Sequence, residues 1–165
     1  MTLAAFNQLE TAEAVEYVRP CADIPRWIEA VVTSRPYSNV EEVLSVAGTR
    51  AVDWTPDEVD GALGHHPRIG ERASGSSAEA GMSRAEQAGV DASDDGLESE
   101  LLAGNREYEE RFGRIFLIRA AGRTGREILD ELRRRLRNTD EDEAREVARQ
   151  LREIALLRLE GILRS

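Results

Sequence analysis

The stretch TGREILDELRRRLR, residues 124–137, decides the fold class, because its apolar residues recur every three or four positions. Ile128, Leu129, Leu132 and Leu136 therefore share one face of a helix. Helical spacing of this kind, rather than the alternation typical of strands, runs through almost the whole chain. We predict one all-α domain over residues 1–165, a helical bundle of short N-terminal and longer C-terminal helices.

Start and stop signals place the other helices. Short helices are predicted to begin after Asp23, Asn39 and Thr55, where an acid or a proline follows the capping residue. Longer helices are predicted over 95–111, 124–137 and 139–163. The apolar run 115–118 is too short for a helix and is flanked by glycines, so we expect buried extended chain there.

The composition narrows the class of partner. The formal net charge is −10, whereas a general nucleic-acid binder needs a cationic surface, so we expect small-molecule or protein partners. All 22 basic residues are arginine, which excludes Schiff-base chemistry through a lysine side chain. Cys21 is the single cysteine, and no apolar run is long enough to cross a bilayer. We therefore expect a soluble, cytoplasmic protein that does not bind membranes.

The segment GHHPRIGE, residues 64–71, is the strongest candidate for the edge of an active site. Pro67 pushes the residue before it out of the helical region, so His66 is held in extended chain where a helix stops. Such an imidazole can point into a cleft and exchange a proton near neutral pH. A His-Pro turn on the surface explains the same residues equally well. His65 and His66 diverge as chain neighbours and no third ligand joins them, so no metal site is predicted.

Two features near residue 80 are each open to two interpretations. Ser83 and Glu86 have the spacing of a capping box, so a helix is expected to begin there. Should that helix start border the cleft beside His66, it would also offer a hydroxyl, a carboxylate and free backbone donors to a polar ligand. The small, polar segment 73–81 is expected to be a loop, either an ordinary surface loop or a lid.

Arg158 lies on an apolar helix face, which it shares with Val147, Leu151, Ile154, Ala155 and Ile162. Because an unpaired buried guanidinium is costly, Arg158 must reach solvent, pair with an acid or meet an anionic ligand. The arginines at 133–135 and 137, by contrast, are expected to form a solvated helix face offset by the acids of 140–146.

Several short motifs occur in an order that resembles one known family. They are Phe6-Asn7, Trp27, Arg35-Pro36-Tyr37, His66 to Gly70, Ser83 to Gly89, Asn105, Tyr108, Arg111 to Gly113, Phe116 to Thr124 and Leu157 to Leu159. This order spans nearly the whole chain and resembles the 2-oxo-4-hydroxy-4-carboxy-5-ureidoimidazoline (OHCU) decarboxylases, enzymes of urate breakdown that yield (S)-allantoin. The chain departs from the family's usual residues at Tyr37, His65 and Arg119, which leaves the fine specificity of the pocket open.

The resemblance implies an all-helical enzyme without cofactor or metal, often a homodimer, that acts on a small ureidoimidazoline. His66 would be the proton donor, Glu86 would hold N–H groups of the substrate and Arg158 would bind its oxygens. The residues that would line the pocket are Pro67, Ser83, Arg84, Ala85, Glu86, Gln87, Ile118, Arg119, Ala120, Ala121 and Gly122.

Two other function classes compete with this hypothesis. A non-catalytic helical interaction module would use the striped helices to bind protein partners. A metal-dependent hydrolase would use the paired histidines. The decarboxylase hypothesis differs from both because it requires His66, Glu86 and Arg158 to surround one pocket.

Overall fold

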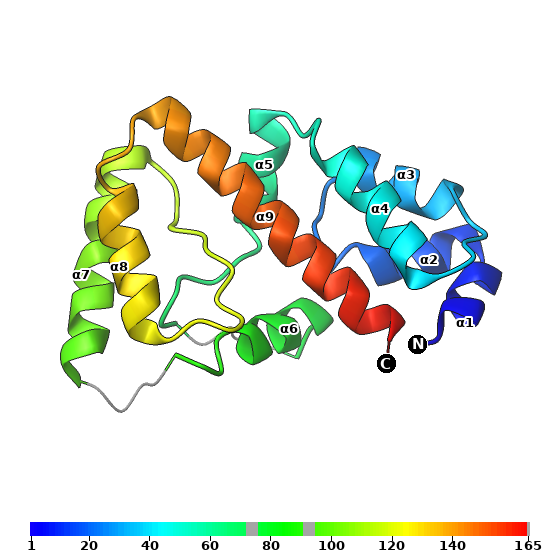
Figure 1. Ribbon diagram of the computed structural model, residues 1–165, viewed down its shortest axis with the longest axis horizontal. Coiled ribbons are helices and arrows are strands. Elements are labelled where there is room, and N and C mark those ends of the chain that lie inside the picture. The colour runs from blue at the N-terminus through cyan, green and yellow to red at the C-terminus, as the bar shows by residue number, and fades with distance from the viewer. Residues whose placement is uncertain (72–75, 91–94, 165) are drawn as a thin grey trace. The chain divides into compact units, whose positions relative to one another are not determined.

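The computed structural model describes residues 1–71, 76–90 and 95–164, and within these ranges every regular element is a helix (Figure 1). The helices are α1 (Leu3–Gln8), α2 (Thr11–Val18), α3 (Pro25–Thr33), α4 (Val40–Ala51), α5 (Pro56–Leu63), α6 (Ala78–Glu86), α7 (Asp95–Phe112), α8 (Gly125–Arg135) and α9 (Asp140–Leu163). The all-α prediction is confirmed. None of these helices is both long and apolar enough to cross a membrane.

The helices form two compact units. One consists of Met1–Ala62 together with Leu151–Ser165, and the other of Leu63–Gln150. Helix α9 contributes its first part to the second unit and its last part to the first. The assignment of residues 1–165 to a single domain stays a prediction.

The first unit is organised around buried aromatic residues. The indole Nε1 of Trp27 donates a hydrogen bond to the carbonyl oxygen of Ala47 at 2.9 Å, and its ring packs edge-on against Trp54 at 5.7 Å between centroids. The Arg35 guanidinium donates to the carbonyl oxygens of Phe6 and Leu9 at 2.7 and 2.9 Å. Trp27 thus ties α3 to α4, and Arg35 ties the chain just after α3 to α1 and the residue that follows it.

The core of the second unit lies between α7 and α8, which run side by side (Figure 1). Gly104 permits this approach, because a Cβ there would lie 2.5 Å from a methyl carbon of Leu132. The run 115–118 is non-helical, and Phe116, Leu117 and Ile118 are buried, as predicted. Buried apolar side chains from the turn at Ile69, from α7, from this run and from α8 make one cluster.

A buried ion pair crosses this core. The Arg135 guanidinium donates to Glu143 Oε1, and its Nη1 donates to the carbonyl oxygen of Leu117 at 2.7 Å. Both side chains are fully buried, with exposed fractions of 0% and 1%. The Tyr108 hydroxyl donates to the same carboxylate. The prediction of a solvated face is therefore wrong for Arg135. Its neighbour Arg134 does pair with one of the expected acids, Glu146, whereas Arg133 pairs with Glu100 on α7.

Most predicted helix starts carry the expected caps. The Asn39 side chain accepts from the backbone N–H of Glu42, and Thr55 and Glu58 bond each other's backbone N–H groups. Thr124 forms a complete capping box with Glu127. Helix α3 differs, because Ile24 is its N-cap and makes no side-chain cap bond.

The predicted helix start at Ser83 is wrong. Helix α6 begins at Ala78, with the Ser77 hydroxyl accepting from the backbone N–H of Ala80 at 3.1 Å. Ser83 to Glu86 therefore form the last turn of α6 rather than its first. The expected loop over 73–81 is corrected accordingly, because 78–81 are helical, and its residues 73–75 lie outside the described ranges.

Candidate active site

The histidine motif follows α5 as irregular chain. His66 donates its backbone N–H to the carbonyl oxygen of Leu63 at 3.0 Å, which closes the end of the helix. His66 is half-buried and His65 is exposed. A tight turn follows Pro67, closed by a hydrogen bond of 3.0 Å from Glu71 N to Arg68 O. Gly70 has φ of +88° in this turn, a conformation that favours glycine. The prediction that His66 lies just beyond a helix end is confirmed.

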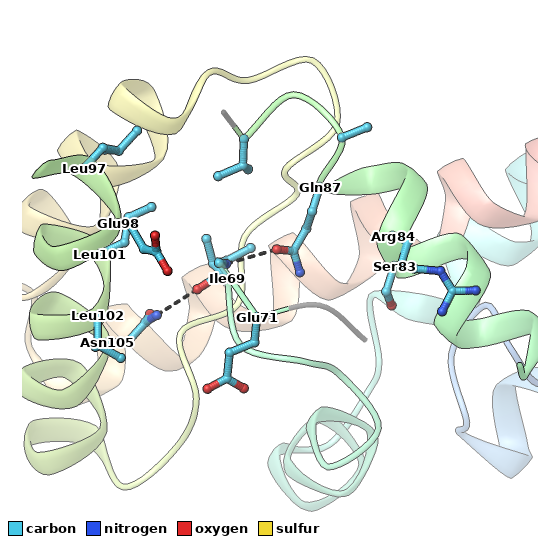
Figure 2. A pocket seen from close by; sticks show the side chains of 13 residues that line it. Ile69, Glu71, Ser83, Arg84, Gln87, Leu97, Glu98, Leu101, Leu102 and Asn105 are labelled. Atoms are coloured by element: carbon cyan, nitrogen blue, oxygen red, sulfur yellow. Dashed lines mark hydrogen bonds between the residues drawn. The ribbon is translucent and has the colours of Figure 1, made fainter. Parts of the chain in front are cut away.

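Side chains from α6 and α7 hold this turn in place (Figure 2). The Gln87 carboxamide accepts from Gly70 N at 3.0 Å and donates to Arg68 O at 3.4 Å. Asn105 Nδ2 donates to Ile69 O at 2.9 Å. The Arg68 guanidinium forms a two-point pair with Glu109, and this hydrogen-bonded cation lowers the pKa of the Glu109 carboxyl.

The end of α6 supplies the next group of predicted site residues. Ser83 is buried, Glu86 and Gln87 are half-buried, and Arg84 and Ala85 are exposed. Because this is the C-terminal turn, its unsatisfied backbone groups are carbonyl oxygens rather than N–H donors. This turn therefore does not offer the free backbone N–H donors that a helix start would have offered to a polar ligand.

A pocket of about 490 Å³ opens between the histidine turn, α6 and α7. Its lining residues are Ile69, Gly70, Glu71, Ser83, Arg84, Gln87, Ala88, Val90, Leu97, Glu98, Leu101, Leu102 and Asn105. Figure 2 shows Leu97, Leu101 and Asn105 on α7 across the pocket from Ser83, Arg84 and Gln87. Three predicted substrate-binding residues, Ser83, Arg84 and Gln87, thus share a cavity. The other predicted site residues are not among those that line it, namely His66, Pro67, Ala85, Glu86, 118–122 and Arg158.

The stretch 118–122 is fixed by groups that the sequence analysis missed. Gln150 Oε1 accepts from the backbone N–H of Arg119 at 2.8 Å, and Arg135 holds the preceding carbonyl of Leu117. Ile118 and Ala120 are buried and Ala121 is half-buried. Gly122 is exposed, with φ of +79°. All of these residues belong to the same unit as His66 and Glu86.

The segment after α6 packs closely against the turn that follows 118–122. A Cβ at Gly89 would lie 3.1 Å from the carbonyl oxygen of Arg123, a distance that leaves little room for a side chain. A Cβ at Gly125 would lie 2.5 Å from a methyl carbon of Leu97, with Val90 nearby. Residues 89 and 90, just after α6, are therefore neighbours of the turn at 123–125, just after the stretch 118–122.

Arg158 lies on α9 in the first unit and is only 4% exposed. Its Nη1 donates to the carbonyl oxygen of Pro20 at 2.9 Å. The apolar face on which the sequence placed it is real, since Leu151, Ile154 and Ala155 are also buried. Arg158 therefore stays out of solvent and donates to a main-chain oxygen. Its convergence with His66 and Glu86 stays a prediction.

Comparison with known proteins places these motifs in a family. The OHCU decarboxylase family model matches residues 7–160. A 2-oxo-4-hydroxy-4-carboxy-5-ureidoimidazoline decarboxylase of Amia calva is 30% identical over 169 residues, covering 99% of this chain and 95% of that protein. A uric acid degradation bifunctional protein of Bacillus sp. (strain TB-90) is 23% identical over 168 residues, and this chain spans 33% of its length.

A solved structure shares the fold. The crystal structure of OHCU decarboxylase in the presence of (S)-allantoin superposes with a TM-score of 0.75 and 24% sequence identity, covering 91% of this chain and 99% of that one. The match to the family model covers the histidine motif, the end of α6, the stretch 118–122 and Arg158.

Proposed function

The chain belongs to the OHCU decarboxylase family, and we propose that it decarboxylates 2-oxo-4-hydroxy-4-carboxy-5-ureidoimidazoline to (S)-allantoin and CO2 without a cofactor, in urate breakdown. The observation that carries the proposal is the match over residues 7–160, which includes every residue that the reaction would use. The placement of His66, Ser83, Glu86 and the stretch 118–122 in one compact unit supports it.

The reaction asks little covalent chemistry of the protein. The bond between the ring carbon and the substrate carboxylate breaks, CO2 leaves, and the electron pair stays on the ring, delocalised into the adjacent unsaturated system. A proton then forms the new C–H bond on one face. The protein therefore needs to orient the substrate, exclude water and deliver a proton, and a positioned acid typically contributes about 10²- to 10⁴-fold in rate.

In the proposal, His66 delivers that proton, and its face of approach sets the (S) configuration. Glu86 accepts hydrogen bonds from ring or ureido N–H groups, since an ionised carboxylate can only accept. Arg158 binds substrate oxygens through two parallel N–H groups, a geometry that lysine cannot copy. Pro67, Ser83 to Gln87 and 118–122 surround the substrate.

The two adjacent histidines allow a matched test of this role. OHCU is generated from urate by the two preceding activities, and its optical decay and the chirality of the allantoin are followed. We expect His66→Ala to lower kcat by about 10²- to 10⁴-fold and to abolish the bias toward the (S) product. The exposed neighbour offers the control, because His65→Ala should keep kcat within about twofold and should keep the bias toward the (S) product. Unchanged formation of (S)-allantoin by His66→Ala would remove His66 from the mechanism.

We further propose that the protein is a cytoplasmic homodimer. The family resemblance supports the dimer, and the single buried cysteine, Cys21, suits a reducing compartment. Light scattering on the purified chain measures the mass directly. A mass of one chain at micromolar concentration would contradict the dimer.

A further inference from the structure

We propose that Asn105 is a positioning residue for the decarboxylation, and that it acts by holding the histidine turn where His66 must deliver its proton. This inference rests on the proposed function for its catalytic consequence, but its structural part can be measured without substrate. Asn105 lies on α7, outside all the segments for which the sequence predicted a role in the site.

The contact is specific to one main-chain group of the turn. Asn105 is 4% exposed, and its Nδ2 donates to the carbonyl oxygen of Ile69, itself 6% exposed, at 2.9 Å. The Gln87 carboxamide occupies the carbonyl of Arg68 and the N–H of Gly70 on either side. Three consecutive residues of the turn are thus fixed by two amide side chains from two different helices.

The position of this turn determines the position of His66, because the chain between them is short and conformationally restricted. Only Pro67 separates His66 from Arg68, and its ring fixes φ. On its other side, His66 is attached to the end of α5 through the bond to Leu63. A shift of Ile69 would therefore be passed on to the imidazole rather than absorbed by flexible chain.

The other end of the Asn105 side chain makes no compensating contact with the described part of the chain. Its Oδ1 is buried and accepts no hydrogen bond in the described part of the chain. A buried unsatisfied acceptor is unfavourable, and native structures keep few of them. The one hydrogen bond that Asn105 makes through its side chain is therefore the bond to Ile69 in the described part of the chain.

The test removes the donor and the unsatisfied acceptor together. Asn105→Leu keeps a similar volume, deletes the unsatisfied Oδ1 and leaves the Ile69 carbonyl without its donor, so one unpaired acceptor replaces another and the stability should stay close to that of the parent. We expect kcat to fall by about 10- to 100-fold, because a small displacement of a catalytic group strongly lowers the reaction rate. KM should change by less than about threefold, because Asn105 lines the pocket but is not one of the groups proposed to bind the substrate.

Trp27→Phe is the matched control. It removes a bond of the same kind, from a buried side-chain N–H to a main-chain carbonyl at 2.9 Å, but in the first unit. We expect this variant to lose stability and to keep kcat within about twofold. The pair therefore separates loss of a buried hydrogen bond in general from loss of the bond to Ile69.

A direct readout comes from the histidines, because the chain has only two. The imidazole signals in carbon–proton NMR spectra can be assigned with one variant, His65→Ala, because only the His66 signals remain in its spectrum. Asn105→Leu should move the His66 signals, whereas Trp27→Phe should not. Should Asn105→Leu fail to fold, Asn105→Ala removes the same donor with a smaller side chain.

The outcomes separate this proposal from the proposed function. Movement of the His66 signals together with a loss of kcat supports both. Movement of those signals with unchanged kcat supports positioning by Asn105 and removes His66 from the chemistry. His66 signals that stay in place in Asn105→Leu overturn the positioning role, whatever happens to kcat.

Discussion

At single residues, the spacing of apolar positions predicted some buried side chains correctly and missed others. The spacing of Leu151, Ile154 and Arg158 correctly placed the arginine on a buried apolar face, but it did not predict that the guanidinium stays out of solvent and donates to the carbonyl oxygen of Pro20. The same reasoning would have found Arg135, which follows Leu132 by three residues and Ile128 by seven. Because Arg135 stands within a run of arginines, we interpreted the whole run as a solvated face and missed its apolar spacing. Its partners Glu143 and Leu117 could not be named from the sequence, because they depend on how α8 meets α9 and the run 115–118.

Arg135 leads to a prediction at the same scale. Arg135→Met would leave the Glu143 carboxylate buried without its cation, a change that typically costs about 3–5 kcal/mol. We expect a loss of this size in the free energy of unfolding, measured by urea denaturation. Adding Glu143→Leu should recover part of it, because the uncompensated charge is then gone. A double variant no more stable than Arg135→Met would contradict this account.

Glu58 gives a pH-dependent prediction. Hydrogen bonds from Arg26 and from the backbone N–H of Thr55 lower the pKa of its carboxyl to about 2. Because the folded pKa lies below the ordinary value, this stabilisation is complete above about pH 5 and is lost as the pH falls toward 2. The side chains are partly exposed, so we expect Glu58→Gln to cost only about 0.5–1 kcal/mol at pH 7. The cost should shrink toward zero near pH 2. An equal cost at both pH values would contradict the assigned cause.

Among the elements, helices with strong signals were predicted well and α6 was not. Asn39, Thr55 and Thr124 each combine a capping side chain with an acid three residues later, and each begins a helix. Ser83 and Glu86 have the same spacing but lie in the last turn of α6. The real cap, Ser77, is followed by Ala80 at the third position, so it lacks the acid that makes a capping box recognisable.

The α6 assignment can be checked with two serines. Ser77→Ala removes the hydroxyl that accepts from Ala80 N, and such caps contribute about 1 kcal/mol. We expect faster hydrogen exchange of the α6 amides in this variant. Ser83→Ala removes no cap and should leave exchange in the first turn of α6 unchanged. Faster exchange in Ser83→Ala and unchanged exchange in Ser77→Ala would instead indicate that the helix begins at Ser83.

For the whole molecule, periodicity predicted the all-α class but not the division into two units. No glycine or proline marks the boundary near residue 150, because α9 continues through it. Val147 and Gln150 belong to one unit, and Leu151 and Leu159 to the other. Such a boundary depends on which residues pack together across long sequence separations. The local composition near residue 150 does not indicate it.

The shared helix makes a prediction about unfolding. An isolated helix of about a dozen residues is marginal in water, so each half of α9 depends on packing within its own unit. Leu132→Ala and Leu159→Ala each open a cavity at a fully buried leucine and should cost about 2–5 kcal/mol. By hydrogen exchange, Leu132→Ala should accelerate α7, α8 and the first half of α9, whereas Leu159→Ala should accelerate the second half of α9 and the other helices of the first unit. Uniform acceleration of all helices by either variant would instead mean that the two units unfold as one cooperative domain.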